Sequence, residues 1–199
     1  MENNGPLYFG QKLTRTIDDH AAAKGTPAQM PFPQKSYFRP LMGALLSAVV
    51  RPSAECQTIL IPKSREMMTS WTICLYVTWV CQFRPGTLAV VQTLKETKAG
   101  ELVRYCTILA ENQDPFLKER HQLAYSNAME IGWKNGSRIF GIPQGEHQIR
   151  MFHPMIAVFD EMAFMEDAEA CFNAVLPVAK QIIGVSSAHA GWMADMCGQ

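Results

Sequence analysis

The sequence has no excess of charge of either sign. Its 199 residues include 18 lysines and arginines and 18 aspartates and glutamates, so the formal net charge at pH 7 is +0. A strongly basic composition would by itself indicate nucleic-acid binding, and composition gives no such argument here. A local basic face is still compatible with this balance.

The sequence also lacks the cysteine patterns of metal sites and the long apolar runs of membrane proteins. Its six cysteines form no C-x-x-C pair and no Cys/His cluster with zinc spacing, so we expect reduced and mostly buried thiols. The apolar stretches 41–50 and 71–83 are too short to span a bilayer, and residues 1–10 do not have the pattern of a signal peptide. These absences predict a soluble, cytoplasmic protein with no membrane partner.

Glycine is absent from one stretch where it would be expected. The segment "IPKSREMMTSW", residues 61–71, joins a strand-like apolar run to a helix-like apolar run. A strand, a short polar loop and a helix form the layout of a phosphate-binding loop, which usually contains glycines and has its lysine directly before a hydroxyl residue. Here Lys63 stands at the start of the loop, and Thr69 and Ser70 stand at its end.

The hydrophobic pattern predicts one α/β domain with a mostly parallel sheet flanked by helices. Apolar runs of strand length lie at 56–61, 87–93, 155–159 and 181–188. Helical patterns lie at 39–50, 69–83, 94–113 and 168–179. Unbroken apolar strands that alternate with helices are typical of a parallel sheet covered on both faces. Residues 1–35 show little periodicity, and we expect them to form an extended N-terminal arm.

One antiparallel element interrupts this order. The residues "MEIGWKNGSRIFGIP" (129–143) alternate on both sides of Asn135-Gly136, a dipeptide that favours a type I′ turn. We therefore expect an inserted β-hairpin at this point of the chain.

Polar residues follow three of the predicted strands. Asp160 and Glu161 come directly after the strand at 155–159, Ser186 and Ser187 end the last strand, and the first strand leads into the loop that begins at Lys63. Ligands bind outside the carboxyl ends of strands in open α/β sheets. We therefore expect these residues to share one site.

These residue types meet the needs of a nucleoside triphosphate with Mg²⁺. Lys63 can neutralise the β- and γ-phosphates, Ser70 and Asp160 can offer oxygen ligands to the metal, and Glu161 can orient a water molecule. Two simpler alternatives stay open: Asp160 as the cap of the following helix, and the two serines as partners of the local backbone. Arg65 can contact either the γ-phosphate or a neighbouring carboxylate.

With these motifs in order, the chain resembles the ATPase domain of the large terminase subunit of tailed phages, the motor that packages DNA into proheads. "KSREMMTS" (63–70) is similar to a variant Walker A loop with lysine at its first position, although Met68 stands where glycine is usual. "MIAVFDE" (155–161) is similar to a Walker B strand, and "VSSA" (185–188) to the coupling motif. "MPFPQKSYFRP" (30–40) loosely resembles the region that reads adenine through a glutamine, here Gln34. The resemblance covers most of residues 30–195.

The resemblance implies a P-loop NTPase-like ATPase domain over residues 36–199 that uses ATP and Mg²⁺. It implies metal binding by Ser70 and Asp160, catalytic roles for Glu161 and Arg65, and coupling of hydrolysis to movement by Ser186, Ser187 and Ala188. Nucleotide contacts are implied for Gln34 and for the loop residues Lys63, Ser64, Arg65, Glu66, Met67, Met68, Thr69 and Ser70.

The resemblance also implies partners: double-stranded DNA, the small terminase subunit, the portal protein and further copies of the chain in a ring, all in the host cytoplasm. Large terminases carry a second, RNase H-like nuclease domain, so we expect this chain to be the motor domain alone, without nuclease activity. Two alternatives stay open: a helicase-like P-loop ATPase, and an inactive prophage remnant that keeps the fold. Measured ATPase activity would identify the remnant, and dependence on a portal would separate the motor from the helicase.

Overall fold

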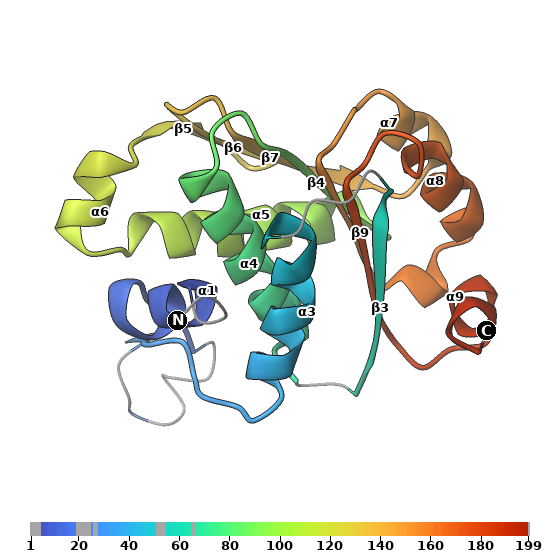
Figure 1. Ribbon diagram of the computed structural model, residues 1–199, viewed down its shortest axis with the longest axis horizontal. Helices are drawn as coiled ribbons and strands as arrows, with labels where there is room; N and C mark the ends of the chain where they lie inside the picture. The colour runs from blue at the N-terminus through green and yellow to red at the C-terminus, as the bar shows by residue number, and fades with distance from the viewer. Residues whose placement is uncertain (1–4, 19–24, 26–27, 51–54, 65–66, 199) are drawn as a thin grey trace.

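A seven-stranded sheet forms the centre of the molecule in the computed structural model, which describes residues 5–18, 25, 28–50, 55–64 and 67–198. The strand order is β3-β9-β8-β4-β7-β6-β5, with β3 at one edge (Figure 1). The five strands from β3 to β7 in this order are parallel, and β6 and β5 are antiparallel. The bounds are β3 Gln57–Lys63, β4 Leu88–Thr93, β5 Leu123–Ser126, β6 Glu130–Trp133, β7 Arg138–Pro143, β8 Ile156–Asp160 and β9 Gln181–Ser187. The predicted α/β fold with a mostly parallel sheet is confirmed.

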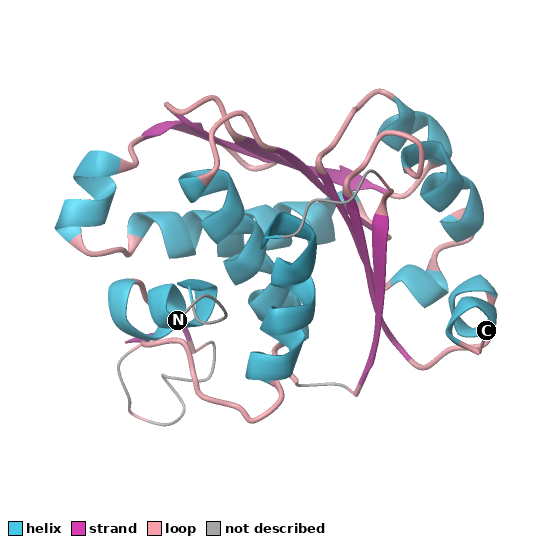
Figure 2. Cartoon of the chain, viewed as in Figure 1, coloured by secondary structure: helices cyan, strands magenta, loops and turns pink. Residues whose placement is uncertain are grey.

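Helices cover both faces of the sheet (Figure 2). One face carries α3 (Phe38–Val50), α4 (Thr69–Phe83), α5 (Glu96–Glu111) and α6 (Pro115–Arg120). The other carries α7 (Glu146–Arg150), the 3₁₀ helix η3 (Met162–Phe164), α8 (Ala168–Val175) and α9 (Trp192–Cys197). The sequence patterns did not predict α6, α7, α9 or β5, because elements of four to six residues are too short to show a period. Within the described residues, the helices are too short or too polar to span a bilayer.

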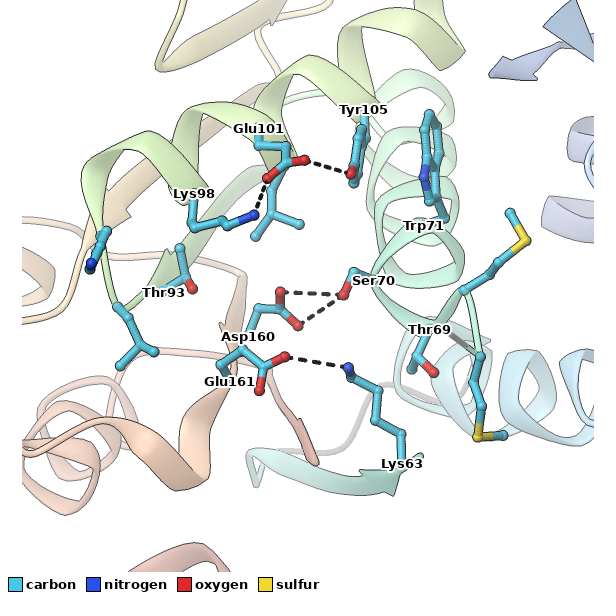
Figure 3. Close-up of a pocket in the computed structure, with 15 residues that line it drawn as sticks. Lys63, Thr69, Ser70, Trp71, Thr93, Lys98, Glu101, Tyr105, Asp160 and Glu161 are labelled. Atoms are coloured by element: carbon cyan, nitrogen blue, oxygen red, sulfur yellow. Dashed lines mark hydrogen bonds and ion pairs between the residues drawn. The ribbon is translucent and has the colours of Figure 1, made fainter. Parts of the chain in front are cut away.

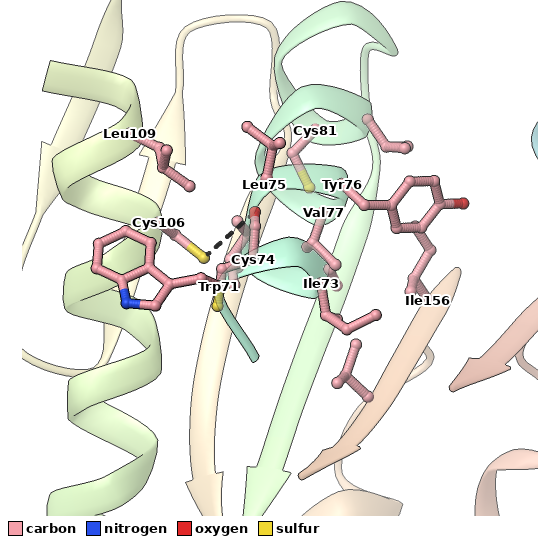
Figure 4. Close-up of a cluster of buried hydrophobic side chains, with 14 of the residues drawn as sticks. Trp71, Ile73, Cys74, Leu75, Tyr76, Val77, Cys81, Cys106, Leu109 and Ile156 are labelled. Atoms are coloured by element: carbon pink, nitrogen blue, oxygen red, sulfur yellow. Dashed lines mark hydrogen bonds between the residues drawn. The ribbon is translucent and has the colours of Figure 1, made fainter. Parts of the chain in front are cut away.

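The central strands are buried on both sides, which is why they read as unbroken apolar runs. Val91 and Val158 point into the core under α4 and α5, whereas Val90 and Ala157 point into the core under α8. Helix α4 is buried nearly all round, with Tyr76 and Leu75 fully inaccessible to solvent (Figure 4). A helix enclosed in this way holds its N-terminus in a fixed position at the carboxyl end of the sheet.

The N-terminal segment differs from the extended arm that the sequence predicted. A short helix α1 (Gly5–Tyr8), a π-helical turn η2 (Phe9–Leu13) and the strands β1 (Thr16–Ile17) and β2 (Gln29–Met30) form in its described part. The side chains of Leu7, Phe9 and Phe32 belong to the main hydrophobic core. Apolar residues spaced irregularly along this segment gave no period, so only tertiary packing reveals their burial.

The predicted hairpin is present as β6 and β7, but its turn differs from the expected type. A type I′ turn needs positive φ at both central residues. Gly136 has a φ of 85°, whereas Asn135 is not among the residues with positive φ. The backbone N–H of Gly136 donates to the carbonyl of Trp133. The turn is therefore a type I turn followed by a left-handed glycine, the usual three-residue hairpin loop.

Candidate functional site

The sheet register brings three strand ends together. Strand β9 lies between β3 and β8. Lys63, the last residue of β3, is paired with Ser187 at the end of β9, and Asp160, the last residue of β8, is paired with Val185. The three predicted strand-end groups therefore meet at the carboxyl ends of neighbouring parallel strands, where ligands bind in open α/β folds.

The loop from β3 to α4 ends in a left-handed residue. Met68 has a φ of 53° and precedes the first residue of α4, and its side chain makes no capping hydrogen bond. The first N–H groups of α4 thus carry the partial positive charge of the helix N-terminus without a side-chain cap. The hydroxyl of Tyr37, the residue before α3, donates to the carbonyl of Met67 and so holds one end of this loop. Arg65 and Glu66 lie outside the described residues.

Ser70 and Asp160 form a direct oxygen pair. The Ser70 hydroxyl donates to the Asp160 carboxylate, at 3.0 Å to Oδ1 and 3.3 Å to Oδ2. Burial, and then the nearby charge of Glu161, raise the pKa of Asp160 to about 6, although the Ser70 hydrogen bond and Lys63 oppose this. Asp160 is the last residue of β8, and Glu161 occupies the cap position of η3. The alternative in which Asp160 caps the following helix is therefore wrong.

Glu161 connects the other two strand ends. Its Oε1 lies 3.4 Å from the Nζ of Lys63, and its Oε2 accepts a hydrogen bond of 3.4 Å from the Ser187 hydroxyl. Glu161 has a φ of 58°, so it shares with Met68 the left-handed conformation that non-glycine residues rarely adopt. Such strained residues gather at functional sites, where the surrounding structure holds them in place.

Met68, Ser70, Asp160 and Glu161 line one cavity of about 470 Å³, together with Lys63 (Figure 3). The side of α4 and the strand ends contribute Lys63, Thr69, Ser70, Asp160 and Glu161 to its wall. The opposite wall comes from the start of α5 and had not been predicted: it includes Lys95, Lys98, Glu101 and Tyr105. The spacing of Lys98, Glu101 and Tyr105 puts them on one helix face directly after β4, and that signal could have identified them.

Four of the predicted residues line other cavities. Gln34 lines a separate polar cavity of about 480 Å³ with Gln11 and Arg39. Ser186 is buried, and its hydroxyl has no hydrogen-bond partner among the described residues. Ser186, Ser187 and Ala188 line a third cavity, next to α9, of about 460 Å³. The alternative in which Ser187 bonds only to local backbone does not match its contact with Glu161.

The donor set at Ser70 and Asp160 suits Mg²⁺. Both side chains offer oxygen atoms, and Asp160 provides a carboxylate whose raised pKa reflects a buried negative charge. Mg²⁺ in nucleotide sites usually takes one or two protein oxygens and completes its shell with water and phosphate. In the described part of the chain, no group of three or more His, Cys, Asp or Glu side chains could hold a metal ion. A metal at this cavity would complete its shell with water or with oxygens of a bound ligand.

No protein-family model and no curated protein matches the sequence. Solved structures do match. The large terminase of bacteriophage HK97 aligns with 92% of this chain at 14% identity and a TM-score of 0.65. The large terminase ATPase domain of Thermus phage P74-26 aligns with 91% at 11% identity and a TM-score of 0.54. A mutant of that same domain aligns with 91% at 12% identity and a TM-score of 0.52.

This likeness concerns the fold. The chain spans 37% of the length of the HK97 chain and 73% and 74% of the two P74-26 chains. At these identities the likeness shows a shared fold, a mostly parallel sheet flanked by helices, and no more.

Proposed function

We propose that this chain is an ATP-hydrolysing motor domain of a DNA-packaging terminase. The observation that carries the proposal is the convergence of Lys63, Ser70, Asp160 and Glu161 on one cavity at the carboxyl end of a parallel sheet. The fold shared with large terminase ATPase domains supports it. ATP and Mg²⁺ are the proposed ligands.

Each side chain has a role that its position supports. Lys63, beside the N-terminus of α4, would neutralise the β- and γ-phosphates, and Ser70 and Asp160 would hold Mg²⁺. Bound Mg²⁺ would supply positive charge that offsets the charge of the phosphates. Lys63 contacts Glu161 at 3.4 Å in this structure, so a nucleotide that draws Lys63 away would leave the Glu161 carboxylate able to orient the attacking water.

Ser187 offers a route from hydrolysis to movement. Its hydroxyl contacts Glu161, and the chain continues from it through Ala188 toward α9. A change in the contacts of Glu161 would therefore alter its hydrogen bond with Ser187 at the end of β9. We propose that Ser186, Ser187 and Ala188 form the coupling segment, with Ser186 supplying a buried hydroxyl ready to accept a new partner.

The proposed setting is a homo-oligomeric ring in the host cytoplasm, with double-stranded DNA, a small terminase subunit and a portal protein as partners.

A nucleotide-binding domain without turnover is the second candidate. It is favoured by Met68, which lines the cavity beside the proposed phosphate site and whose backbone has the left-handed conformation that suits glycine.

The first experiment tests the relocated lysine. Lys63→Ala should lower the affinity for Mg·ATP by at least about tenfold, because a charge-assisted contact to phosphate is lost. Its melting temperature should stay close to that of the wild type. Lys118→Ala, an exposed lysine on α6, is the matched control and should bind ATP normally. Equal affinities for the Lys63→Ala variant and the wild type would reject the loop as a phosphate site.

The second experiment separates the motor from the inactive candidate. Glu161→Gln should bind ATP almost normally and hydrolyse it about 10²–10⁴-fold more slowly, as expected for a lost general base. Phosphate release by the wild type, measured with and without portal and DNA, gives the reference rate. A wild type that binds ATP but releases no phosphate under any of these conditions supports the inactive candidate.

A further inference from the structure

A second cation faces the cavity from α5, opposite the Walker-like loop. The Nζ of Lys98 lies 2.7 Å from Oε2 of Glu101, and the other oxygen of Glu101 accepts a 2.9 Å hydrogen bond from the hydroxyl of Tyr105. Figure 3 shows Lys98 and Glu101 above Asp160, on the side of the cavity away from Lys63. Neither residue belongs to the set that the sequence motifs identified.

The charges of the described residues that line the cavity are balanced before any ligand binds. Three lysines, Lys63, Lys95 and Lys98, face three carboxylates, Glu101, Asp160 and Glu161. Lys63 and Lys98 are each engaged by a glutamate. A nucleoside triphosphate adds more negative charge than one Mg²⁺ offsets, so lysines that line the cavity would be drawn toward the phosphates.

The pair of Lys98 and Glu101 can be opened at little cost. The two side chains are 66% and 36% exposed, and exposed ion pairs typically stabilise a protein by about 0–1 kcal/mol. Glu101 would keep its hydrogen bond from Tyr105 after Lys98 left. The pKa of Lys98 is raised chiefly by Glu101, with smaller contributions from Asp160 and Glu161. Its ammonium group therefore already lies in the electrostatic field of these two carboxylates, which are proposed to bind the metal and to orient the water.

We propose that Lys98 is a phosphate-binding residue of this cavity, which exchanges Glu101 for the terminal phosphate of a bound nucleoside triphosphate. The inference rests on the proposed nucleotide site. Lys63 and the N-terminus of α4 approach the phosphates from one side, and Lys98 approaches from the side of Asp160 and Glu161. The terminal phosphate belongs on that side, because the metal and the attacking water must both reach it. Lys98 would thus distinguish a triphosphate from a diphosphate.

The test compares the affinities of ATPγS and ADP, both with Mg²⁺ at constant ionic strength. Lys98→Ala should weaken ATPγS about tenfold, the usual size of one charge-assisted contact, and ADP less than about twofold. Lys98→Arg should restore most of the ATPγS affinity. Glu101→Gln should tighten ATPγS, since Lys98 is then no longer held by a carboxylate. Lys118→Ala is the control for the loss of one exposed positive charge.

Each outcome decides a specific point. Equal losses of ATPγS and ADP affinity in Lys98→Ala, or no loss of either, would overturn the role of Lys98 while leaving the nucleotide site intact. A wild type that binds neither nucleotide would reject the proposed site itself, and the role of Lys98 with it. Melting temperatures of all variants should match, because Lys98 is exposed and Glu101 keeps a partner.

Discussion

At the scale of single residues, the site is built from side chains that are held by each other. Asp160 is held by Ser70, and Glu161 by both Lys63 and Ser187. The described residues contain two non-glycine positions with positive φ, Met68 and Glu161, and both line the cavity. Strain and buried charge at the same place are typical of a site that binds a ligand at some cost to the stability of the free protein.

Asp160→Asn should stabilise the free chain while it weakens Mg·ATP binding. The folded-state pKa of Asp160, about 6, lies above its ordinary value of 3.8, so the ionised form is disfavoured in the folded state. The shift in pKa lowers the free energy of unfolding of the wild type by at most about 3 kcal/mol at pH 7.5. This penalty, and with it the advantage of the variant, shrinks as the pH falls from about 6 to 4, where the carboxyl group becomes protonated. Denaturant unfolding at pH 7.5 and pH 5 measures it. A stability advantage of the variant that is the same at both pH values would contradict the assignment.

At the scale of elements, a glycine in β7 allows α5 to pack closely against the sheet. A Cβ on Gly141 of β7 would lie 2.8 Å from the carbonyl oxygen of Ala99 and 2.8 Å from a methyl group of Val103, both on α5. Backbone atoms of a packed helix cannot move away cheaply. The close approach of α5 to β7 therefore sets the position of Lys98, one residue before Ala99, relative to the cavity.

Gly141→Ala should destabilise the protein by about 1–3 kcal/mol, the usual cost of overpacking. Its effect should also reach the site, because α5 must shift. Gly43→Ala is the matched control, since the added Cβ in α3 would meet no atom within 4 Å, and alanine is the better helix former by up to about 1 kcal/mol. Thermal unfolding of both variants tests this, and a Gly141→Ala variant as stable as Gly43→Ala would contradict the packing argument.

At the scale of the whole molecule, the N-terminal segment is part of the folded domain. Phe9 is 1% exposed and packs edge-on against Phe83 of α4, with ring centroids 6.2 Å apart. The same segment leads to Tyr37, which holds the carbonyl of Met67 in the candidate phosphate loop. The placement of a domain boundary at residue 35 stays a prediction, but the packing ties both sides of that point to one core.

Phe9→Ala should lower the free energy of unfolding by about 3–5 kcal/mol, because it leaves a cavity in the main core. The neighbouring Tyr8 is 57% exposed, so Tyr8→Ala should change stability by no more than about 0.5 kcal/mol. Urea denaturation of the two variants gives the comparison. Similar stabilities would show that the segment contributes little to the core.

The sequence by itself determined the local elements and the chemistry at the strand ends. Apolar runs indicated the parallel strands because both faces of such strands are buried. The polar residues after them marked a candidate site, because ligands bind at the carboxyl ends of strands in open α/β sheets. Lys63, Ser70, Asp160, Glu161 and Ser187 could be identified in this way. Asn135-Gly136 gave the hairpin, but its turn type depends on backbone angles that two residues alone do not fix.

Only the tertiary structure decided how these pieces meet. Strand β9, the last in the chain, lies between β3 and β8, and this order depends on long-range pairing that no local pattern encodes. That order brings Ser187 to Glu161, and the packing of α5 on the sheet brings Lys98 and Glu101 to the cavity that Glu161 also lines. The burial of Phe9 has the same origin. Local sequence patterns indicate which face of a helix or strand is buried, whereas the tertiary packing determines which other elements bury it.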